Sequence, residues 1–115
     1  MRRIKISKIN IDNLEILNEE IKRFILNKSS KMLAIKHSDK WYSELLQMDI
    51  AQSLFNDFQV KIIRASKAIV SINVKVSEAI VIIQAIIEAR PEKQSKEANV
   101  LENFKIAFHQ QIINI

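Results

Sequence analysis

The chain has 115 residues, enough for one folded domain, and its 48% hydrophobic and 27% charged residues are typical of a globular protein rather than a disordered one. It contains no glycine and no cysteine, which excludes glycine-built phosphate loops, cysteine-ligated zinc, disulfides and thiol chemistry. The net charge is +5, so the position of the excess basic residues along the chain bears directly on function.

Residues 1–11 hold nearly all of this excess charge, because they include four basic residues and no acidic one. Ile4, Ile6, Ile9 and Ile11 are interspersed with polar residues there, a pattern that fits a short strand-like arm or a frayed tail. We therefore divide the chain into a basic N-terminal arm, 1–11, and a single helical domain, 12–115. Acidic residues follow the arm where a secretory signal needs an apolar run, so the default expectation is a cytoplasmic protein.

The first helix is predicted to start at Asp12, a good N-cap, with Glu15 three residues later as in a capping box. Its apolar stripe consists of Leu14, Leu17, Ile21, Phe24 and Ile25. Acidic residues come first in this segment and basic residues later. That order complements a helix dipole, and we prefer this explanation to a groove for nucleic acid.

From Trp41 onward, apolar residues recur with a seven-residue period. With Met48 at position a, the a series is Met48, Phe55, Ile62, Ile69, Val76 and Ile83, and the d series is Ala51, Phe58, Ala65, Ile72, Ala79 and Ile86. Such a repeat predicts a helix over about 41–89 that supercoils with a partner helix. The helix should end before Pro91, because proline disfavours a helical residue before it.

Residues 70–76, V-S-I-N-V-K-V, alternate like a half-buried strand. Because the heptad continues through them, we predict helix there, and we expect 68–89 to be the most buried element. A helix over 41–89 would be roughly 70 Å long, which is too long for a compact monomer of this size. Either it breaks near 66–73, or it stays whole and other chains cover it.

The last helix follows Pro91, with Ser95 as an alternative cap. It carries a clear apolar face, made of Leu101, Phe104, Phe108, Ile112 and Ile115. A terminal segment this apolar is expected to dock on the domain rather than to fray.

Residues for catalysis or metal binding are sparse. The two histidines, His37 and His109, have no carboxylate partner at helical spacing, so we predict no metal site, no cofactor and no enzymatic activity. The longest strongly apolar uncharged run, Ala79 to Ile87, is far shorter than the roughly 20 residues of a membrane span.

These patterns predict an all-α fold, a three- or four-helix bundle around the heptad-patterned helix. The function we favour is a non-enzymatic assembly module, whose partner is itself or another helical protein. The predicted self-association seam consists of Met48, Phe55, Phe58, Ile62, Ile69, Ile72, Val76, Ile83 and Ile86.

The alternative is a basic helical-bundle protein that binds nucleic acid through the arm and the C-terminal half of the first helix. Its predicted contacts are Arg2, Arg3, Lys5, Lys8, Lys28 and Lys31. Phosphate neutralisation would make such binding steeply salt-dependent.

Overall fold

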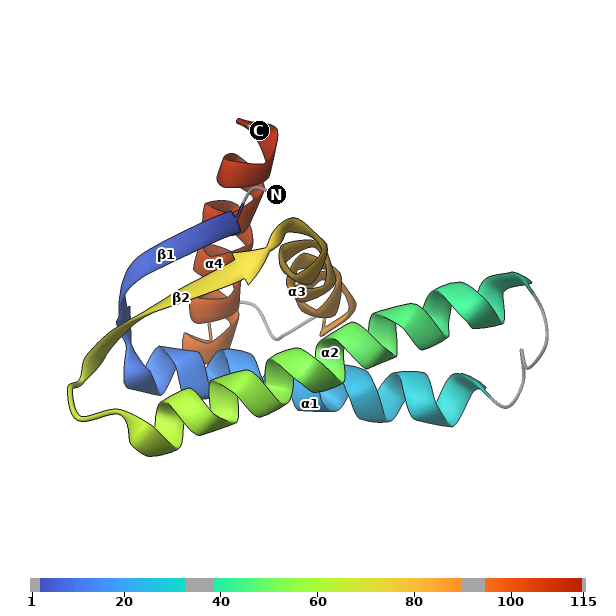
Figure 1. Ribbon diagram of the computed structural model, residues 1–115, viewed down its shortest axis with the longest axis horizontal. Coiled ribbons are helices and arrows are strands. Elements are labelled where there is room, and N and C mark those ends of the chain that lie inside the picture. Colours follow the sequence, from blue (N-terminus) through green and yellow to red (C-terminus); the bar gives the residue numbers. More distant parts are fainter. Residues whose placement is uncertain (1–2, 33–38, 90–94, 115) are drawn as a thin grey trace.

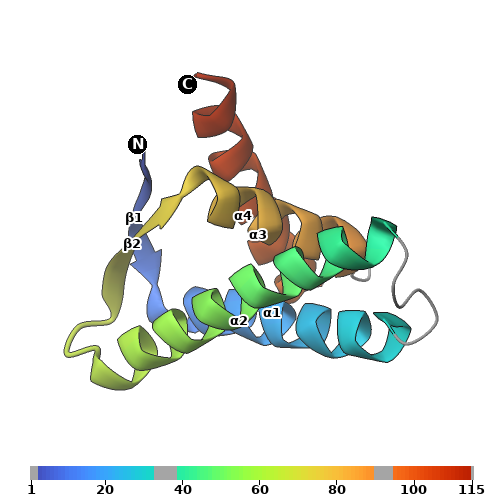
Figure 2. The same cartoon turned by 45° about the vertical axis from the view of Figure 1, so that its right-hand side comes forward.

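The computed structural model describes residues 3–32, 39–89 and 95–114, and within them the chain runs β1, α1, α2, β2, α3, α4. Helices α1 and α2 lie side by side and form the base of the molecule (Figure 1). The two strands pair as an antiparallel ribbon at one end of this base, and α3 and α4 pack on the inner side of the ribbon (Figures 1 and 2).

Strand β1, Arg3–Asn10, explains the uneven spacing of its isoleucines. Ile4 and Ile9 are buried, at 2% and 5% exposure, although they are five positions apart, a spacing that puts side chains on opposite faces of a regular strand. The pairing shifts between Ile6 and Ile9, as a β-bulge, and the extra residue turns Ile9 back to the core face. The arm therefore belongs to the folded domain, which revises the predicted division at residue 11.

Helix α1, Ile11–Met32, begins slightly earlier than predicted. The Oδ1 atom of Asn10, and not the Asp12 side chain, caps it by accepting a hydrogen bond from the Asp12 amide at 2.9 Å. The predicted stripe is largely confirmed: Leu14, Leu17, Ile21 and Phe24 are buried. They lie in one hydrophobic core with Ala51, Leu54 and Phe58 of α2, Asp39–Arg64.

The prediction of helix through 70–76 is wrong for most of that segment. Residues Ile69–Lys75 form β2, which pairs antiparallel with β1 from Arg3↔Lys75 to Asn10↔Ile69. Ile72 and Val74 are 1% and 2% exposed, while Asn73 and Lys75 are exposed. The alternation is thus a true strand signal, and the long-range partner strand that it needs is the N-terminal arm.

Helix α3, Val76–Ala89, follows β2 directly. The Lys75 amide donates to Glu78 Oε1 at 2.7 Å, which is the capping contact that starts a helix at this point. One face of α3 lies in the core, but Ile80 and Ile87 are each 53% exposed. The expectation that 68–89 would be buried on all sides is therefore wrong for this face.

Helix α4, Lys96–Ile113, confirms the predicted C-terminal element. Ser95 is its N-cap, and its side chain accepts a hydrogen bond from the Ala98 amide at 3.0 Å. Leu101, Phe104 and Phe108 are buried and Ile112 packs against the core, as the apolar face predicted, whereas Ile115 lies outside the described residues.

The described part of the chain is therefore mostly helical, with four helices and one two-stranded ribbon. The predicted helix over 41–89 is divided into α2, β2 and α3. The break predicted near 66–73 does occur, but it holds a strand rather than a connection between two helices of a bundle.

Candidate functional site

The outer face of the ribbon is polar and basic. Both strands alternate, so one face carries the buried isoleucines and valines and the other faces away from the core. The outer face exposes Arg3, Lys5 and Lys8 from β1 and Asn73 and Lys75 from β2. We call these five residues, together with the neighbouring Lys61, Arg64 and Lys67, the basic ribbon.

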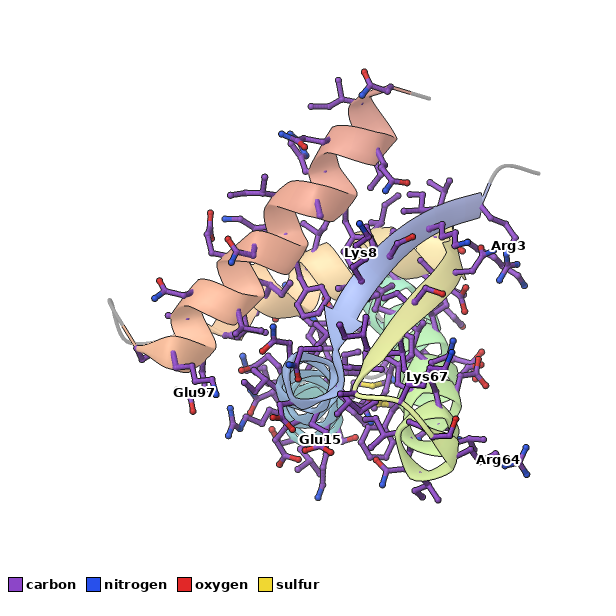
Figure 3. The ribbon with its side chains drawn as sticks, turned by 90° about the vertical axis from the view of Figure 1, so that its left-hand side faces the viewer. Arg3, Lys8, Glu15, Arg64, Lys67 and Glu97 are labelled. Carbon is purple, nitrogen blue, oxygen red and sulfur yellow. The ribbon has the colours of Figure 1, made fainter. Side chains whose placement is uncertain are left out.

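The basic ribbon is assembled from two segments that contain no acidic residue. One is 1–11, and the other is 58–77, which runs from the end of α2 through β2. Figure 3 shows Arg3 and Lys8 on β1, with Lys67 and Arg64 near the far end of the ribbon and of α2. Antiparallel pairing of β1 and β2 therefore places seven described basic side chains in one region.

Two of these basic residues lie directly opposite each other. Arg3 pairs with Lys75 across the ribbon, and Lys5 pairs with Asn73. Like charges in directly opposed positions destabilise a sheet. Asp57 and Glu78 line the same depression as this pair and supply part of its counter-charge.

Lys8 lies at the bulge with a φ of 57°, in the left-handed region. This conformation disfavours non-glycine residues, and the chain has no glycine to place there. The bulge keeps Lys8 exposed while Ile9 returns to the core. Bulges commonly redirect side chains toward binding sites, and this one places Lys8 at a depression that it lines with Asn103 and Ala107 of α4.

Arg3 is held in place by Asn73 on the opposite strand. Its Nε atom donates to Asn73 Oδ1 at 2.8 Å, and its Nη2 atom donates to the Asn73 carbonyl at 3.0 Å. These bonds occupy one edge of the guanidinium, because Nε and one Nη2 hydrogen point to the same side. The Nη1 hydrogens and the second Nη2 hydrogen remain on the other edges of the planar group.

Lys61 connects α2 to the outer edge of β2, since its Nζ atom donates to the Ser71 carbonyl at 2.6 Å. On the other side of the ribbon, Gln111 of α4 donates to the Lys5 carbonyl at 2.7 Å. Both strand edges are therefore fastened to helices, and the ribbon is supported along its whole width. A binding surface on such a support is pre-organised.

Acidic residues line two depressions. Asp57 and Glu78 share one of about 300 Å³ at the ribbon with Arg3, Lys61 and Lys75. A depression of about 450 Å³ beside α1 and the start of α4 is lined by both charge signs but chiefly by acids, namely Asp12, Glu15, Glu19, Glu20 and Glu97, with Arg23 and Lys96. Figure 3 shows Glu15 and Glu97 on this side. The two depressions differ in charge, because acids predominate beside α1 and α4, whereas three basic and two acidic residues line the one at the ribbon.

The structure brings together only some of the predicted nucleic-acid contacts. Arg3, Lys5 and Lys8 share the ribbon, whereas Arg2 lies outside the described residues. Lys31 lies near the other end of α1, about 30 Å away at 1.5 Å per residue. Lys28 is 8% exposed and its Nζ pairs with Glu44 and, at 3.4 Å, with Glu88. It is therefore not available to a phosphate, and that prediction is corrected.

The predicted self-association seam does not form one surface, because its residues are distributed over α2, β2 and α3. Three of them lie in the core of the single chain, at 1–4% exposure: Phe58, Ile72 and Ile86. Four others pack against that core while partly buried: Phe55, Ile62, Val76 and Ile83. Met48 is half-buried and Ile69 is 59% exposed, on the ribbon.

Sequence reasoning missed Lys61, Arg64, Lys67, Asn73 and Lys75. These residues do not stand out in the net charge of a long segment, because the charges of residues 41–90 sum to zero. The shorter segment 58–77 contains four basic residues and no acidic one. A shorter window would have found that segment. The pairing of Asn73 with Arg3 depends on the strand register and has no local sequence signal.

Other kinds of site receive no support from the described residues. In the described ranges, no group of three or more histidine, cysteine, aspartate or glutamate side chains is placed to hold a metal ion. His109 is exposed on α4, and His37 lies outside the described residues. None of the described helices has the length and apolarity needed to cross a membrane.

Comparison of the chain with protein families, with curated proteins and with solved structures found no match.

Proposed function

We propose that this protein binds nucleic acid through the basic ribbon. The observation that carries the proposal is the β1–β2 ribbon, whose two strands expose Arg3, Lys5, Lys8 and Lys75 and contain no acidic residue of their own. Two-stranded antiparallel ribbons are one of the two elements that enter a nucleic-acid groove. The proposal involves no catalytic step, and it keeps the cytoplasmic location expected from the sequence as part of the hypothesis.

Phosphate contacts by these side chains set a quantitative expectation. Each phosphate that a lysine or arginine neutralises on duplex DNA contributes about −0.9 to the slope of log K against log salt concentration. Contacts by Arg3, Lys5, Lys8 and Lys75 therefore give a slope of about −4. Fluorescence anisotropy with a labelled 20-base-pair duplex, at salt concentrations from low to physiological, measures this slope.

The decisive experiment compares two double variants that remove the same charge. In Lys5→Gln with Lys75→Gln the slope should become shallower by about 2, because two phosphate contacts are lost. Lys31→Gln with Lys40→Gln alters exposed lysines at the other end of the α1–α2 hairpin (Figure 1) and should leave the slope near the wild-type value. Equal effects of the two variants would show that net charge alone, and not the ribbon, governs binding.

Deletion of residues 1–11 is not a valid test of this proposal. It would remove the positive charge of the arm, but also Ile4 and Ile9 from the core and the whole partner strand of β2. Loss of binding after this deletion would report unfolding. Point substitutions of exposed ribbon lysines avoid this problem, because those side chains do not contribute to the core.

Self-association remains the second candidate function, on a smaller surface than the predicted seam. Ile80, Ile83 and Ile87 follow a helical i, i+3, i+7 spacing on α3. Ile80 and Ile87 are each 53% exposed, and Ile83 is partly buried. An apolar helical stripe that the described residues leave exposed favours a partner helix, such as α3 of a second copy.

Light scattering at high micromolar concentration tests this second candidate. If α3 mediates self-association, the wild type should be larger than a monomer, and Ile80→Glu with Ile87→Glu should be monomeric. The matched control is Ile63→Glu with Ile113→Glu, which introduces the same two charges at 71% and 66% exposed positions on α2 and α4 and should leave the mass unchanged. A monomeric wild type would remove this candidate.

A further inference from the structure

Arg3 is more ordered than a phosphate contact requires. An exposed arginine loses side-chain entropy when it is held in one conformation, and a phosphate can be neutralised without that restriction. Here two hydrogen bonds to Asn73, at 2.8 and 3.0 Å, fix the guanidinium against β2, at a depression that Arg3 lines together with Lys61, Asp57 and Glu78. A fixed arginine is what recognition of a particular hydrogen-bond pattern needs, because less freedom is lost on binding.

The edge of the guanidinium that Asn73 leaves free matches one base in particular. Nε and one Nη2 hydrogen are used by Asn73, so the Nη1 and remaining Nη2 hydrogens form a second, end-on pair of donors. Guanine presents two adjacent acceptors, O6 and N7, to the major groove, and arginine donating to both is the commonest base-specific contact. The other bases do not offer two adjacent acceptors in that groove.

The dimensions of the ribbon select the form of the duplex. Paired strands lie about 4.8 Å apart, so a two-stranded ribbon with its side chains fits the major groove of B-form DNA, about 12 Å wide. The major groove of an A-form RNA duplex is deep and narrow, and side chains do not read it. Lys5 and Lys8 are exposed on β1, with Lys8 beside Asn103 of α4, and from these positions they would reach the phosphates flanking the groove.

We infer that the ribbon binds B-form DNA in the major groove, and that Arg3, held by Asn73, donates to O6 and N7 of a guanine. This inference rests on the proposed function and adds to it the class of nucleic acid and the base that is read. In this role Asn73 is a positioning residue, because it acts through Arg3.

Removal of a single acceptor atom from guanine tests the inference without any change in phosphate charge. The probes are a 20-base-pair duplex of alternating guanine and cytosine, the same duplex with 7-deazaguanine at every guanine, and an RNA duplex of the same sequence. Wild-type protein should bind the unmodified DNA about 10-fold more tightly than the 7-deazaguanine DNA, within the range of one bidentate contact. It should also bind the unmodified DNA at least about 10-fold more tightly than the RNA.

Two variants assign the effect to the Arg3–Asn73 pair. Arg3→Lys keeps the positive charge but loses the planar pair of donors, and Asn73→Ala leaves Arg3 without its two hydrogen bonds. Both positions are exposed, and circular dichroism verifies that the variants fold. Arg3→Lys should show a clearly smaller preference than the wild type, because a lysine reaches O6 and N7 without a fixed planar pair of donors, and Asn73→Ala should also show a smaller preference.

The possible failures can be told apart. If the wild type binds both DNA duplexes equally, or binds the RNA duplex as tightly as the DNA, the inference is overturned while salt-dependent binding still supports the proposed function. If the wild type binds none of the three duplexes at low salt, both are wrong. If Arg3→Lys keeps the full preference for unmodified guanine, another residue reads the base and the assignment to Arg3 is wrong.

Discussion

Lys28 connects three helices through one buried ammonium group. On α1, its Nζ atom pairs with Glu44 of α2 and, at 3.4 Å, with Glu88 of α3, and it lies 5.1 Å above the ring of Phe24. Burial of a charge is unfavourable unless it is paired, so this arrangement restricts how α2 and α3 can sit on α1. A residue that resembles a surface contact in the sequence is therefore part of the internal packing.

Replacement of Lys28 with methionine should destabilise the fold. The substitution leaves Glu44 and Glu88 facing each other without a counter-charge. Loss of one partner of a buried ion pair is strongly destabilising, but the side chain of Glu88 is 32% exposed, which reduces the effect to about 2 kcal/mol. Urea denaturation measures the change. Lys31→Met, at an exposed position, is the control and should change stability by less than about 0.5 kcal/mol. An unchanged Lys28→Met variant would contradict this assignment.

The left-handed backbone at Lys8 predicts an inverted order of stability at two nearby positions. At Lys8, with its φ of 57°, glycine should be more stable than valine by about 1–2 kcal/mol, because a β-branched residue is strongly disfavoured there. At Lys5, inside the regular part of β1, valine should be the more stable of the two. Thermal unfolding of the four variants measures both differences. If valine is the more stable residue at Lys8 as well as at Lys5, there is no bulge at Lys8.

At the scale of elements, two kinds of periodicity compete in one segment. The sequence of residues 69–75 fits both a heptad repeat and a strict alternation of apolar and polar residues. A pattern within this segment carries no information about a partner strand 70 residues away in the chain. β1 supplies that partner: Ile4 faces Val74 and Ile6 faces Ile72 across the ribbon. Their burial against the inner side of the ribbon decides the conformation, since tertiary packing overrides intrinsic helix preferences. The helices could be predicted because their stripes are long and local.

The cap of α4 allows an element-level test. Ser95 accepts a hydrogen bond from the Ala98 amide at 3.0 Å and so satisfies one of the free donors at the helix start. Ser95→Ala should therefore reduce the free energy of unfolding by about 1 kcal/mol. Ser53→Ala, at an exposed position inside α2, is the matched control and should be neutral or slightly stabilising. A neutral Ser95→Ala would mean that α4 begins at a different residue.

At the scale of the whole molecule, chain topology separates charge that the sequence distributes more evenly. The end of α2 and β2 return to β1, which brings the acid-free segments 1–11 and 58–77 together. The acids of early α1 lie beside the start of α4 instead. Directional charge of this kind steers an anionic partner to one face and raises the rate of encounter. The candidate site is therefore a property of the assembled ribbon.

A partner that binds only the folded ribbon should raise the melting temperature. At a duplex concentration of 100 times the dissociation constant, binding stabilises the folded state by about 2.7 kcal/mol. At low salt this should increase the melting temperature of the wild type by several degrees, up to about 10 °C. Lys5→Gln with Lys75→Gln should show a clearly smaller increase. An equal increase in that variant would indicate that the duplex binds elsewhere.

The sequence by itself determined α1, the N-terminal helix of the heptad segment and α4, because repeating apolar stripes and caps such as Ser95 act within a few residues. It also determined the basic character of residues 1–11 and the limits that the absence of glycine and cysteine places on chemistry. Only the tertiary structure decided that Ile69–Lys75 is a strand, that Lys28 is internal and that Arg3 meets Asn73. The physical reason is range: strand pairing, burial of charge and cross-strand contacts join residues far apart in the chain, and their energies are set by the partner rather than by the local pattern.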